Sequence, residues 1–350
     1  MNSSQRRAGS FLAVAPGRVN LIGDHTDYMG GLALPMAINL ATTITATTAS
    51  SVIELTSEQV DGDIHVPLPV TQPNQVTPGW GRYVAGVAAV LGSTEGFVGR
   101  VTSTLPLGSG LSSSAALEVA TALALGDSGS PLEIAVHCQS AEQLASGVPC
   151  GIMDQLAIAS ATEGNGLLID FSNNSVTEVP IPDTAQFWVI HSGEERQLVG
   201  SAYAERRAQA EQAAALVGPL PEADLSSINA VKDRVLRGRA RHVQTECARV
   251  RLFAAALLQS DLHQCGRLMI ESHTSLRDDY EVSTAKMDSL VNQLCATSGV
   301  YGARLTGAGF GGCVVALADP DIELQGLRVH PSAGAHLQWL TEDENESAQR

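Results

Sequence analysis

The sequence predicts an α+β protein of two domains. A chain of 350 residues with 44% hydrophobic content is long enough to bury two ordinary cores. Alternating β-branched runs and long Ala-rich stretches follow one another irregularly, which favours an α+β fold over a regular βαβ array. A Pro-Asp turn at residues 182 and 183 is a candidate boundary. We therefore expect domains at 1–182 and 183–350.

The first domain is predicted to open as a strand, a loop and a second strand. Apolar residues from Phe11 lead into PGRVNLIGDHTDYMGG, and the alternating LALPMAINLATTITATT follows. TPGWGRYVAGVAAVLG is predicted to be a helix, capped by Thr77 and ended by Gly92. VTSTLPLGSGLSSSAALEVATALAL then combines a β-rich run, a Gly/Ser loop and an Ala/Leu helix. A further helix is predicted from about Leu132 to Ser146.

The second domain is predicted to begin with the strand QFWVIHSG. Ala- and Arg-rich helices are expected between about Ser201 and Leu258. SGVYGARLTGAGFGGCVVALAD places glycines between two apolar β-type runs. The charged final residues EDENESAQR are expected to be frayed.

Charge and composition exclude several functions. A formal net charge of −16 disfavours binding to nucleic acid or anionic lipid, because both need clustered positive charge. The only two lysines, Lys232 and Lys286, do not fit a Walker-type loop, which requires its own lysine. Phosphate chemistry here would depend on arginine, backbone amides or a metal.

The lengths of the apolar segments and the spacing of the cysteines predict where the protein is located. No apolar stretch is long enough to cross a bilayer, so no membrane span is expected. The residues before Pro16 lack the apolar core of a secretion signal and are predicted to be a flexible lead-in. Six scattered cysteines without a CxxC spacing favour reduced thiols over a zinc site. A cytoplasmic protein is expected.

The Gly/Ser loop from Leu107 to Ser114 is a candidate phosphate site. It lies between an extended run and a helix, so free amides and the positive end of the helix dipole would converge on an anion. The serine hydroxyls can donate to phosphate oxygens or ligate a hard cation. An ordinary serine-capped helix after a glycine turn is the alternative.

The segment from Arg18 to Tyr28 concentrates hydrogen-bonding side chains in a short loop. Such density suits a polyhydroxylated ligand, because each sugar hydroxyl must regain the bonds it loses from water. Taken singly, Asp24 and Asp27 would more often be turn or cap residues. The cluster favours the ligand-binding interpretation.

Two further carboxylates and a third glycine run have open roles. Asp154 is either a helix N-cap or a catalytic group, the latter only if a cation such as Arg18 meets it in space. Glu142 is an ordinary exposed helix carboxylate unless its context says otherwise. The run TGAGFGGC is a phosphate-approach loop or a tight bend, and the bend is favoured.

Three separated segments resemble the signature motifs of the GHMP kinases, and specifically those of the galactokinase family. PGRVNLIGDHTDYMGG resembles the sugar signature, LPLGSGLSSSAALEVA the ATP-binding motif and LTGAGFGGC the third motif. TPGWGRYVAGV, AEQLASGVPCGIMDQ, RARHVQTECARV and GRLMIESHTSLRDDYEVS are also similar to that family. The resemblance extends from about Pro16 to Cys313.

The resemblance implies a two-domain GHMP-kinase fold with the active site in the cleft between domains. At matching positions, Asp154 corresponds to the catalytic aspartate and Arg18 to the arginine that orients the sugar hydroxyl and the phosphate. Ser114 and Glu142 match the Mg²⁺ ligands, and Trp80 and Tyr83 lie in the segment that lines the base. The phosphate-loop positions are Gly108, Ser109, Gly110, Leu111, Ser112, Ser113 and Ser114. The implied sugar contacts are Asp24, His25, Asp27, Gly151, Asp154 and Tyr203.

The implied activity is ATP-dependent phosphorylation of the anomeric hydroxyl of galactose to galactose 1-phosphate, in galactose catabolism. The expected partners are galactose and MgATP, and a monomer or weak dimer is expected. Asp24 departs from the family, which usually has glutamate there, so the hydroxyl it contacts is less defined. A kinase for N-acetylgalactosamine, another sugar or a non-sugar alcohol, or a non-catalytic galactose sensor, are the alternatives. The intact SSSAAL sequence disfavours the sensor.

Overall fold

The computed structural model describes residues 8–194 and 199–344. Residues 1–7 of the predicted lead-in and 345–350 of the predicted frayed tail lie outside the described residues. The lead-in prediction is wrong for residues 10–15, because the first strand, β1 (Ser10–Ile22), begins at Ser10 and pairs with β2 (Leu32–Ser50) from its first residue.

A large sheet, mostly antiparallel, forms the first half of the protein. Among the described residues, its strands run in the order β12 (His336–Trp339), β1, β2, β5, β3 and β4, and β3 and β5 are the one pair that runs parallel. β6 pairs with β2 and β7. The strands up to residue 180 are β1 (Ser10–Ile22), β2 (Leu32–Ser50), β3 (Val52–Ser57), β4 (Ile64–Pro67), β5 (Glu95–Ser103), β6 (Asn165–Asp170) and β7 (Ser175–Pro180).

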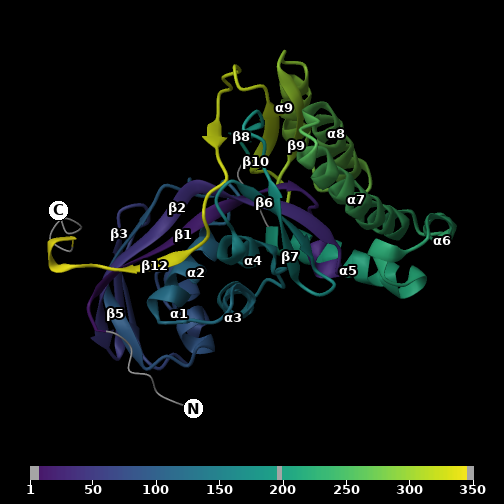
Figure 1. Cartoon of the computed structure of the whole chain (residues 1–350). Helices are drawn as coiled ribbons and strands as arrows, with labels where there is room; N and C mark the ends of the chain where they lie inside the picture. The colour runs from purple at the N-terminus through teal and green to yellow at the C-terminus, as the bar shows by residue number, and fades with distance from the viewer. Residues whose placement is uncertain (1–7, 195–198, 345–350) are drawn as a thin grey trace.

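Four helices pack below this sheet in the view of Figure 1. They are α1 (Gly81–Val90), α2 (Ser113–Ala124), α3 (Pro131–Ser146) and α4 (Met153–Ser160). The helix predicted from about Leu132 begins at Pro131, where Ser130 and Glu133 form a capping box. Helix α1 begins four residues later than the predicted cap Thr77, because Gly81 and Arg82 first close turns onto the carbonyls of Pro78 and Gly79.

The second half contains a smaller antiparallel sheet with the order β11-β8-β10-β9. Helices α8 (Leu262–Asp278) and α9 (Ala285–Cys295) pack on β9. The four strands are β8 (Gln186–His191), β9 (Val300–Leu305), β10 (Cys313–Ala318) and β11 (Leu327–Val329). The remaining helices are α5 (Val199–Val217), α6 (Leu225–Ala230) and α7 (Arg234–Leu258), with short 3₁₀ turns η1 (Asp27–Met29), η2 (Pro73–Gln75) and η3 (Leu220–Glu222). The mixture of sheets and helices confirms the α+β prediction.

The end of the chain returns to the first sheet. Strand β12 (His336–Trp339) pairs antiparallel with β1, and Trp339 packs edge-on against Phe11 with ring centroids 5.5 Å apart. Figure 1 shows this yellow segment descending from the second half to lie along the first sheet. Residues 336–339 therefore belong to the first sheet, although they fall in the range 183–350 that was predicted for the second domain. The boundary near residue 182 stays a prediction.

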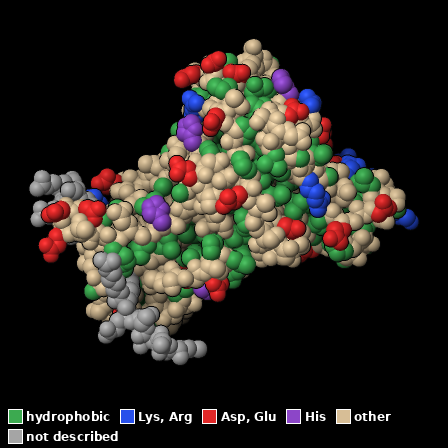
Figure 2. Space-filling view, in the orientation of Figure 1, with side chains coloured by type: hydrophobic (Ala, Val, Ile, Leu, Met, Phe, Trp, Pro, Cys, Tyr) green, Lys and Arg blue, Asp and Glu red, His purple; other side chains and the backbone are tan. Residues whose placement is uncertain are grey.

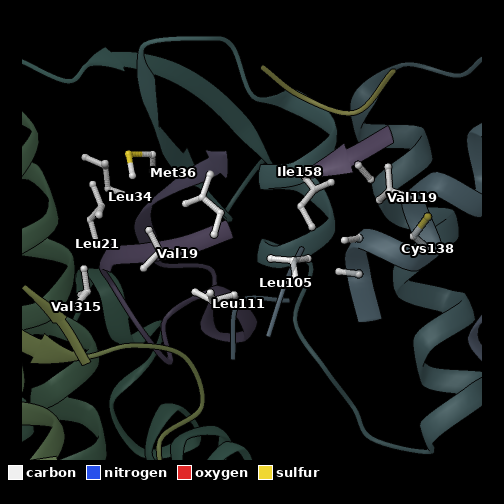
Figure 3. Packing of buried hydrophobic residues seen from close by; sticks show 14 of the residues in the cluster. Val19, Leu21, Leu34, Met36, Leu105, Leu111, Val119, Cys138, Ile158 and Val315 are labelled. Atoms are coloured by element: carbon white, nitrogen blue, oxygen red, sulfur yellow. The ribbon is translucent and has the colours of Figure 1, made fainter. Parts of the chain in front are cut away.

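Two buried side chains fix the Gly/Ser loop against β1. Leu105 precedes the loop and Leu111 lies within it, and both are buried in the cluster that contains Val19, as Figure 3 shows. Gly17 makes this approach possible, because a β-carbon there would lie 2.4 Å from Cδ2 of Leu105. The neighbouring amide of Arg18 donates to the Leu111 carbonyl at 3.1 Å. The fold thus places Arg18 next to the loop.

Acidic side chains are not confined to one part of the face that Figure 2 shows. On the face shown in Figure 2, Asp and Glu are scattered over both halves, and most of the visible Lys and Arg lie on the side of α5, α6 and α7. Among residues 8–194 and 199–344, no helix is long and apolar enough to cross a membrane.

Candidate active site

Two cavities meet at three side chains. The larger has a volume of about 990 Å³ and the smaller about 170 Å³. Arg18, Glu142 and Asp154 line both of them. The cavity lined by the predicted phosphate loop and the cavity lined by predicted sugar contacts therefore share the same charged groups.

The larger cavity has the Gly/Ser loop as one wall. Helix α2 begins at Ser113, so the free amides of its first turn lie at this wall and favour an anion. Six of the seven predicted loop positions line the cavity: Gly108, Ser109, Gly110, Ser112, Ser113 and Ser114. The seventh, Leu111, is buried in the core with 1% exposure. Its contribution is the carbonyl that accepts from Arg18.

Arg18 and Asp154 form a two-pronged ion pair. Nε of Arg18 donates to Oδ1 of Asp154 at 2.8 Å, and Nη2 donates to Oδ2 at 2.6 Å. Nη1 donates to the Gly110 carbonyl at 2.7 Å, which ties the pair to the loop. Asp154 lies in the first turn of α4, after the flanking residue Ile152. The N-cap interpretation of Asp154 is therefore wrong, and the cation that its catalytic role requires is present.

Ser112 adds a contact to Asp154 that the sequence did not indicate. Its backbone is left-handed, with φ of +62°, a conformation that non-glycine residues rarely adopt. This conformation accompanies a hydrogen bond in which Oγ donates to Oδ2 of Asp154 at 2.5 Å. Ser112 thus contacts the candidate base as well as the larger cavity.

Glu142 and Ser114 provide hard oxygen donors where the cavities meet. Oγ of Ser114 donates to Oε1 of Glu142 at 3.2 Å, and Glu142 is half-buried, not exposed on its helix. Burial, with the nearby charge of Asp154, raises the pKa of Glu142 above its usual value. A divalent cation would relieve that penalty.

The donor set fits magnesium better than a soft metal. Within the described parts of the chain, no group of three or more His, Cys, Asp and Glu side chains could hold a metal ion. Mg²⁺ commonly uses one or two carboxylates together with substrate phosphates and water. Ser114 and Glu142 beside a phosphate loop match that pattern.

The smaller cavity brings together all the predicted sugar contacts. Its lining includes Asp24, His25, Asp27, Gly151, Asp154 and Tyr203. Tyr203 comes from α5 and Gly151 from the loop before α4, so these contacts are assembled by the fold and not by sequence proximity.

Asp24 is held from behind by the second half of the chain. Fully buried Arg304 donates from Nη2 to Oδ2 of Asp24, and the Gly307 amide donates to Oδ1 at 2.9 Å. A carboxylate oxygen can accept more than one hydrogen bond, so Asp24 retains acceptor capacity toward the cavity. The ion pair anchors this shorter side chain on the cavity wall.

His25 presents its ring to the cavity, with both nitrogens already bonded. Burial lowers the pKa of His25 to about 3, so the ring is neutral. The Ala308 carbonyl only accepts, so Nε2 donates to it at 3.1 Å, and Nδ1 accepts from the Tyr28 hydroxyl at 2.8 Å. A sugar can therefore contact the ring of His25 or its backbone, but not a free ring nitrogen.

Comparison with known proteins agrees with this geometry. The model of the galactokinase galactose-binding signature matches residues 3–48, that of the GHMP kinase N-terminal domain matches 82–162 and that of the C-terminal domain matches 253–329. A galactokinase from Canis lupus familiaris is 44% identical over 333 residues, covering 89% of this chain and 84% of the relative. A Homo sapiens galactokinase is 43% identical, covering 90% and 85%. The chain belongs to the galactokinase family.

A solved structure supports the same assignment for the fold. Lactococcus lactis galactokinase complexed with galactose is 30% identical, with a TM-score of 0.87, covering 93% of this chain and 95% of that one. This member of the galactokinase family is accordingly a sugar kinase with the two-part GHMP-kinase fold. The predicted family and enzyme class are confirmed.

Two residues predicted for the base segment of this galactokinase-family site lie outside the lining of both cavities. Trp80 and Tyr83 line neither cavity, and Nε1 of Trp80 donates to the Gly62 carbonyl at 3.0 Å. Their contact with a base stays a prediction.

Other lining residues were missed by sequence reasoning. The far wall of the larger cavity comes from the second sheet and its flanks: Val189, Ile190, His191, Cys313, Gln325, Gly326 and Leu327. Cys313 ends the third motif, and no motif marks the other positions. The third glycine run combines two roles. A β-carbon on Gly309 would lie 2.4 Å from the Val282 carbonyl oxygen, so the predicted tight bend is present at Gly309. Gly307 and Ala308, however, line the smaller cavity.

Proposed function

We propose that this kinase transfers the γ-phosphoryl group of MgATP to the anomeric hydroxyl of galactose, giving galactose 1-phosphate and ADP. The observation that carries the proposal is the meeting of the two cavities at Arg18, Glu142 and Asp154. A nucleotide with its phosphates on the Gly/Ser loop and a sugar in the smaller cavity would have their reacting atoms at this junction. In-line transfer requires that arrangement.

Arg18 would orient both partners. Two of its nitrogens hold Asp154, and the third is bonded to the Gly110 carbonyl of the phosphate loop. Because the guanidinium is planar and always charged, it keeps Asp154 in one orientation. Its charge also favours the negative charge that develops on the transferring group.

Asp154 would accept the proton of the anomeric hydroxyl. As the bond between the sugar oxygen and the γ-phosphorus forms, the bond from that phosphorus to the bridging oxygen of ADP breaks, and ADP leaves with that oxygen. The hydroxyl becomes more acidic as this bond forms. The proton therefore passes to Asp154 late in the step.

Ser114 and Glu142 would hold Mg²⁺ with the phosphates of the nucleotide. When bound, the ion neutralises phosphate charge and orients the oxygens of the nucleotide. Asp24, Asp27 and Tyr203 would bind sugar hydroxyls, with Asp24 on the hydroxyl farthest from the anomeric carbon.

A coupled ADP-release assay tests the proposal. Galactose, glucose, talose, galactosamine and N-acetylgalactosamine are each supplied with MgATP, and Asp154→Asn serves as the blank. We expect turnover of galactose and its loss in Asp154→Asn. Preference for another sugar would change the substrate, and tight sugar and ATP binding without turnover would indicate a sensor.

A further inference from the structure

The residue after the candidate base faces a different part of the site. Successive helical residues point about 100° apart, so Asp154 lines both cavities while Gln155 lines neither. Gln155 is fully buried on α4. Its amide nitrogen Nε2 donates to Oε2 of Glu142 at 2.6 Å and to Oε2 of Glu118 at 3.0 Å. One amide group therefore bridges two carboxyl groups from α2 and α3.

The two oxygens of Glu142 have different neighbours. Oε2 is bonded to Gln155, and Oε1 is beside the hydroxyl of Ser114 at 3.2 Å. With Oε2 held, the carboxylate cannot rotate freely about its last bond. Oε1 and the Ser114 oxygen are then kept together on the same side of Glu142.

We propose that Gln155 is the positioning residue for the divalent cation, an inference that rests on the proposed function. It fixes Glu142 so that Oε1, with Oγ of Ser114, faces the ion and the nucleotide phosphates. Groups behind metal ligands orient them and typically change metal affinity 10- to 100-fold when removed. Because Gln155 follows Asp154, one turn of α4 carries the candidate base and the support for the metal ligand.

The chemistry at position 155 requires an amide. An NH₂ group offers two donors, and here both go to carboxyl groups, which fixes the orientation of the amide. A carboxylate at this position would oppose Glu142, and an apolar side chain would leave Glu118 and Glu142 without this donor. Oε1 of Gln155 is buried and has no hydrogen-bond partner, so the contacts of this side chain are made through Nε2.

Metal binding, measured apart from turnover, tests the inference. Binding of Mn²⁺ in the presence of ADP is followed by the loss of the free-ion paramagnetic resonance signal. Wild type is compared with Gln155→Leu, which removes both donors, and Gln155→Glu, which nearly keeps the side-chain volume. Gln186→Leu is the matched control, because Gln186 is a buried glutamine at the start of β8 that lines neither cavity. Calorimetric titration with galactose alone reports on the sugar pocket.

We expect both Gln155 variants to bind Mn²⁺ in the ADP complex about 10- to 100-fold more weakly, with galactose binding and the circular dichroism spectrum unchanged. Raising the metal concentration should restore turnover. Gln186→Leu should keep the wild-type Mn²⁺ affinity. If Gln155→Leu does not fold, Gln155→Glu carries the test.

Unchanged Mn²⁺ affinity in a folded Gln155 variant would overturn the inference, and so would an equal loss in Gln186→Leu. The proposed function has its own readout, which is turnover of galactose by wild type. A wild type that binds Mn²⁺ and ADP but does not phosphorylate galactose fails that proposal alone. If Mn²⁺ binds no more tightly to wild type with ADP than to ADP alone, the inference and the proposed function are both overturned.

Discussion

A β-carbon on Gly151 would lie 1.5 Å from Oδ2 of Asp27. Gly151 precedes α4 and Asp27 begins the turn η1, and both line the smaller cavity. No real side chain could occupy that position without displacing the carboxylate. The place of Asp27 in the sugar pocket therefore depends on the absence of a side chain at residue 151.

Gly151→Ala should accordingly impair sugar binding. Its φ is not positive, so the backbone accepts alanine and the effect comes from the clash alone. We expect the KM for galactose to rise about 100-fold, the loss typical of a 1 Å misplacement in a site, with the KM for ATP unchanged. Gly79→Ala is the control, because a β-carbon there has nothing within 4 Å. Steady-state kinetics with each substrate varied would show the difference, and equal changes in both KM values would contradict it.

Sugar affinity should depend on pH through Asp27. Loss of solvation in the small cavity, together with the charges of Asp154 and Asp24, raises the pKa of Asp27 to about 6, although backbone amides at Tyr28 and Asp27 act in the opposite direction. Above that pH the group is an ionised acceptor for a sugar hydroxyl. Below it the proton occupies the acceptor site, so binding should weaken by up to about tenfold per pH unit.

Calorimetric titration of galactose between pH 5 and 8 measures this dependence without turnover. Wild type should lose affinity as pH falls through about 6. Asp27→Asn should bind more weakly at pH 8 and show a flat profile over this range. A wild-type affinity that is the same at both ends would refute the role of Asp27.

Arg207 should affect the sugar pocket without contacting the sugar. From α5, its Nη1 donates to the Pro149 carbonyl at 2.8 Å, and its guanidinium lies 5.6 Å from the centre of the Tyr28 ring. These contacts join the helix that carries Tyr203 to the loop that carries Gly151. Arg207→Ala should raise the KM for galactose about tenfold, the cost of one charged hydrogen bond.

A neighbouring variant separates this role from a general effect of charge. Glu211 pairs with Nε of Arg207 at 2.8 Å on the helix surface, where such pairs contribute little. Glu211→Gln leaves the Pro149 contact in place and should keep the wild-type KM for galactose. A similar KM increase in both variants would show that the ion pair, and not the link to Pro149, matters.

The site was predictable where its residues are close in the chain. The Gly/Ser loop, the segment from Arg18 to Tyr28 and the helix that carries Glu142 each have a local pattern. The loop predicted from Arg18 is wrong for residues 18–22, because they belong to strand β1, which pairs with β2. The pairing of Arg18 with Asp154 was only conditional, because 136 residues separate them. Sequence spacing does not show which distant strands and helices meet.

Other features left no pattern to detect. Strand β12 has four residues and is held by backbone pairing and by Trp339 on Phe11, so its composition alone does not distinguish it from a loop. The left-handed backbone of Ser112 is a property of the folded loop, since serine has no preference for it. Gln155 is one polar residue beside an apolar helical run, which marks no role for it, and its two carboxyl partners come from other helices.

The buried carboxyl group of Glu118 leads to a prediction about stability. Glu118 lies on α2 with no exposed surface, and Oε2 accepts from Gln155 while Oε1 has no partner. Burial, followed by the charge of Glu142, raises the pKa of Glu118 well above its usual value of 4.5. The group is therefore protonated and neutral at a pH where the unfolded chain has lost this proton.

The pH dependence follows from that difference in bound protons. The stability that Glu118 contributes is fully present below pH 4.5 and is lost as pH rises through the folded-state pKa, because unfolding then releases a proton. Glu118→Gln keeps the shape and neutrality without the proton. The free energy of unfolding of Glu118→Gln, minus that of wild type, should thus increase with pH by up to about 1.4 kcal/mol for each pH unit.

Urea titrations at pH 6, 7 and 8 measure this increase, and the exposed Glu163→Gln should show none. A difference between Glu118→Gln and wild type that is constant with pH would mean that Glu118 is ionised in the folded protein, in which case the amide of Gln155 would bridge two charged carboxylates.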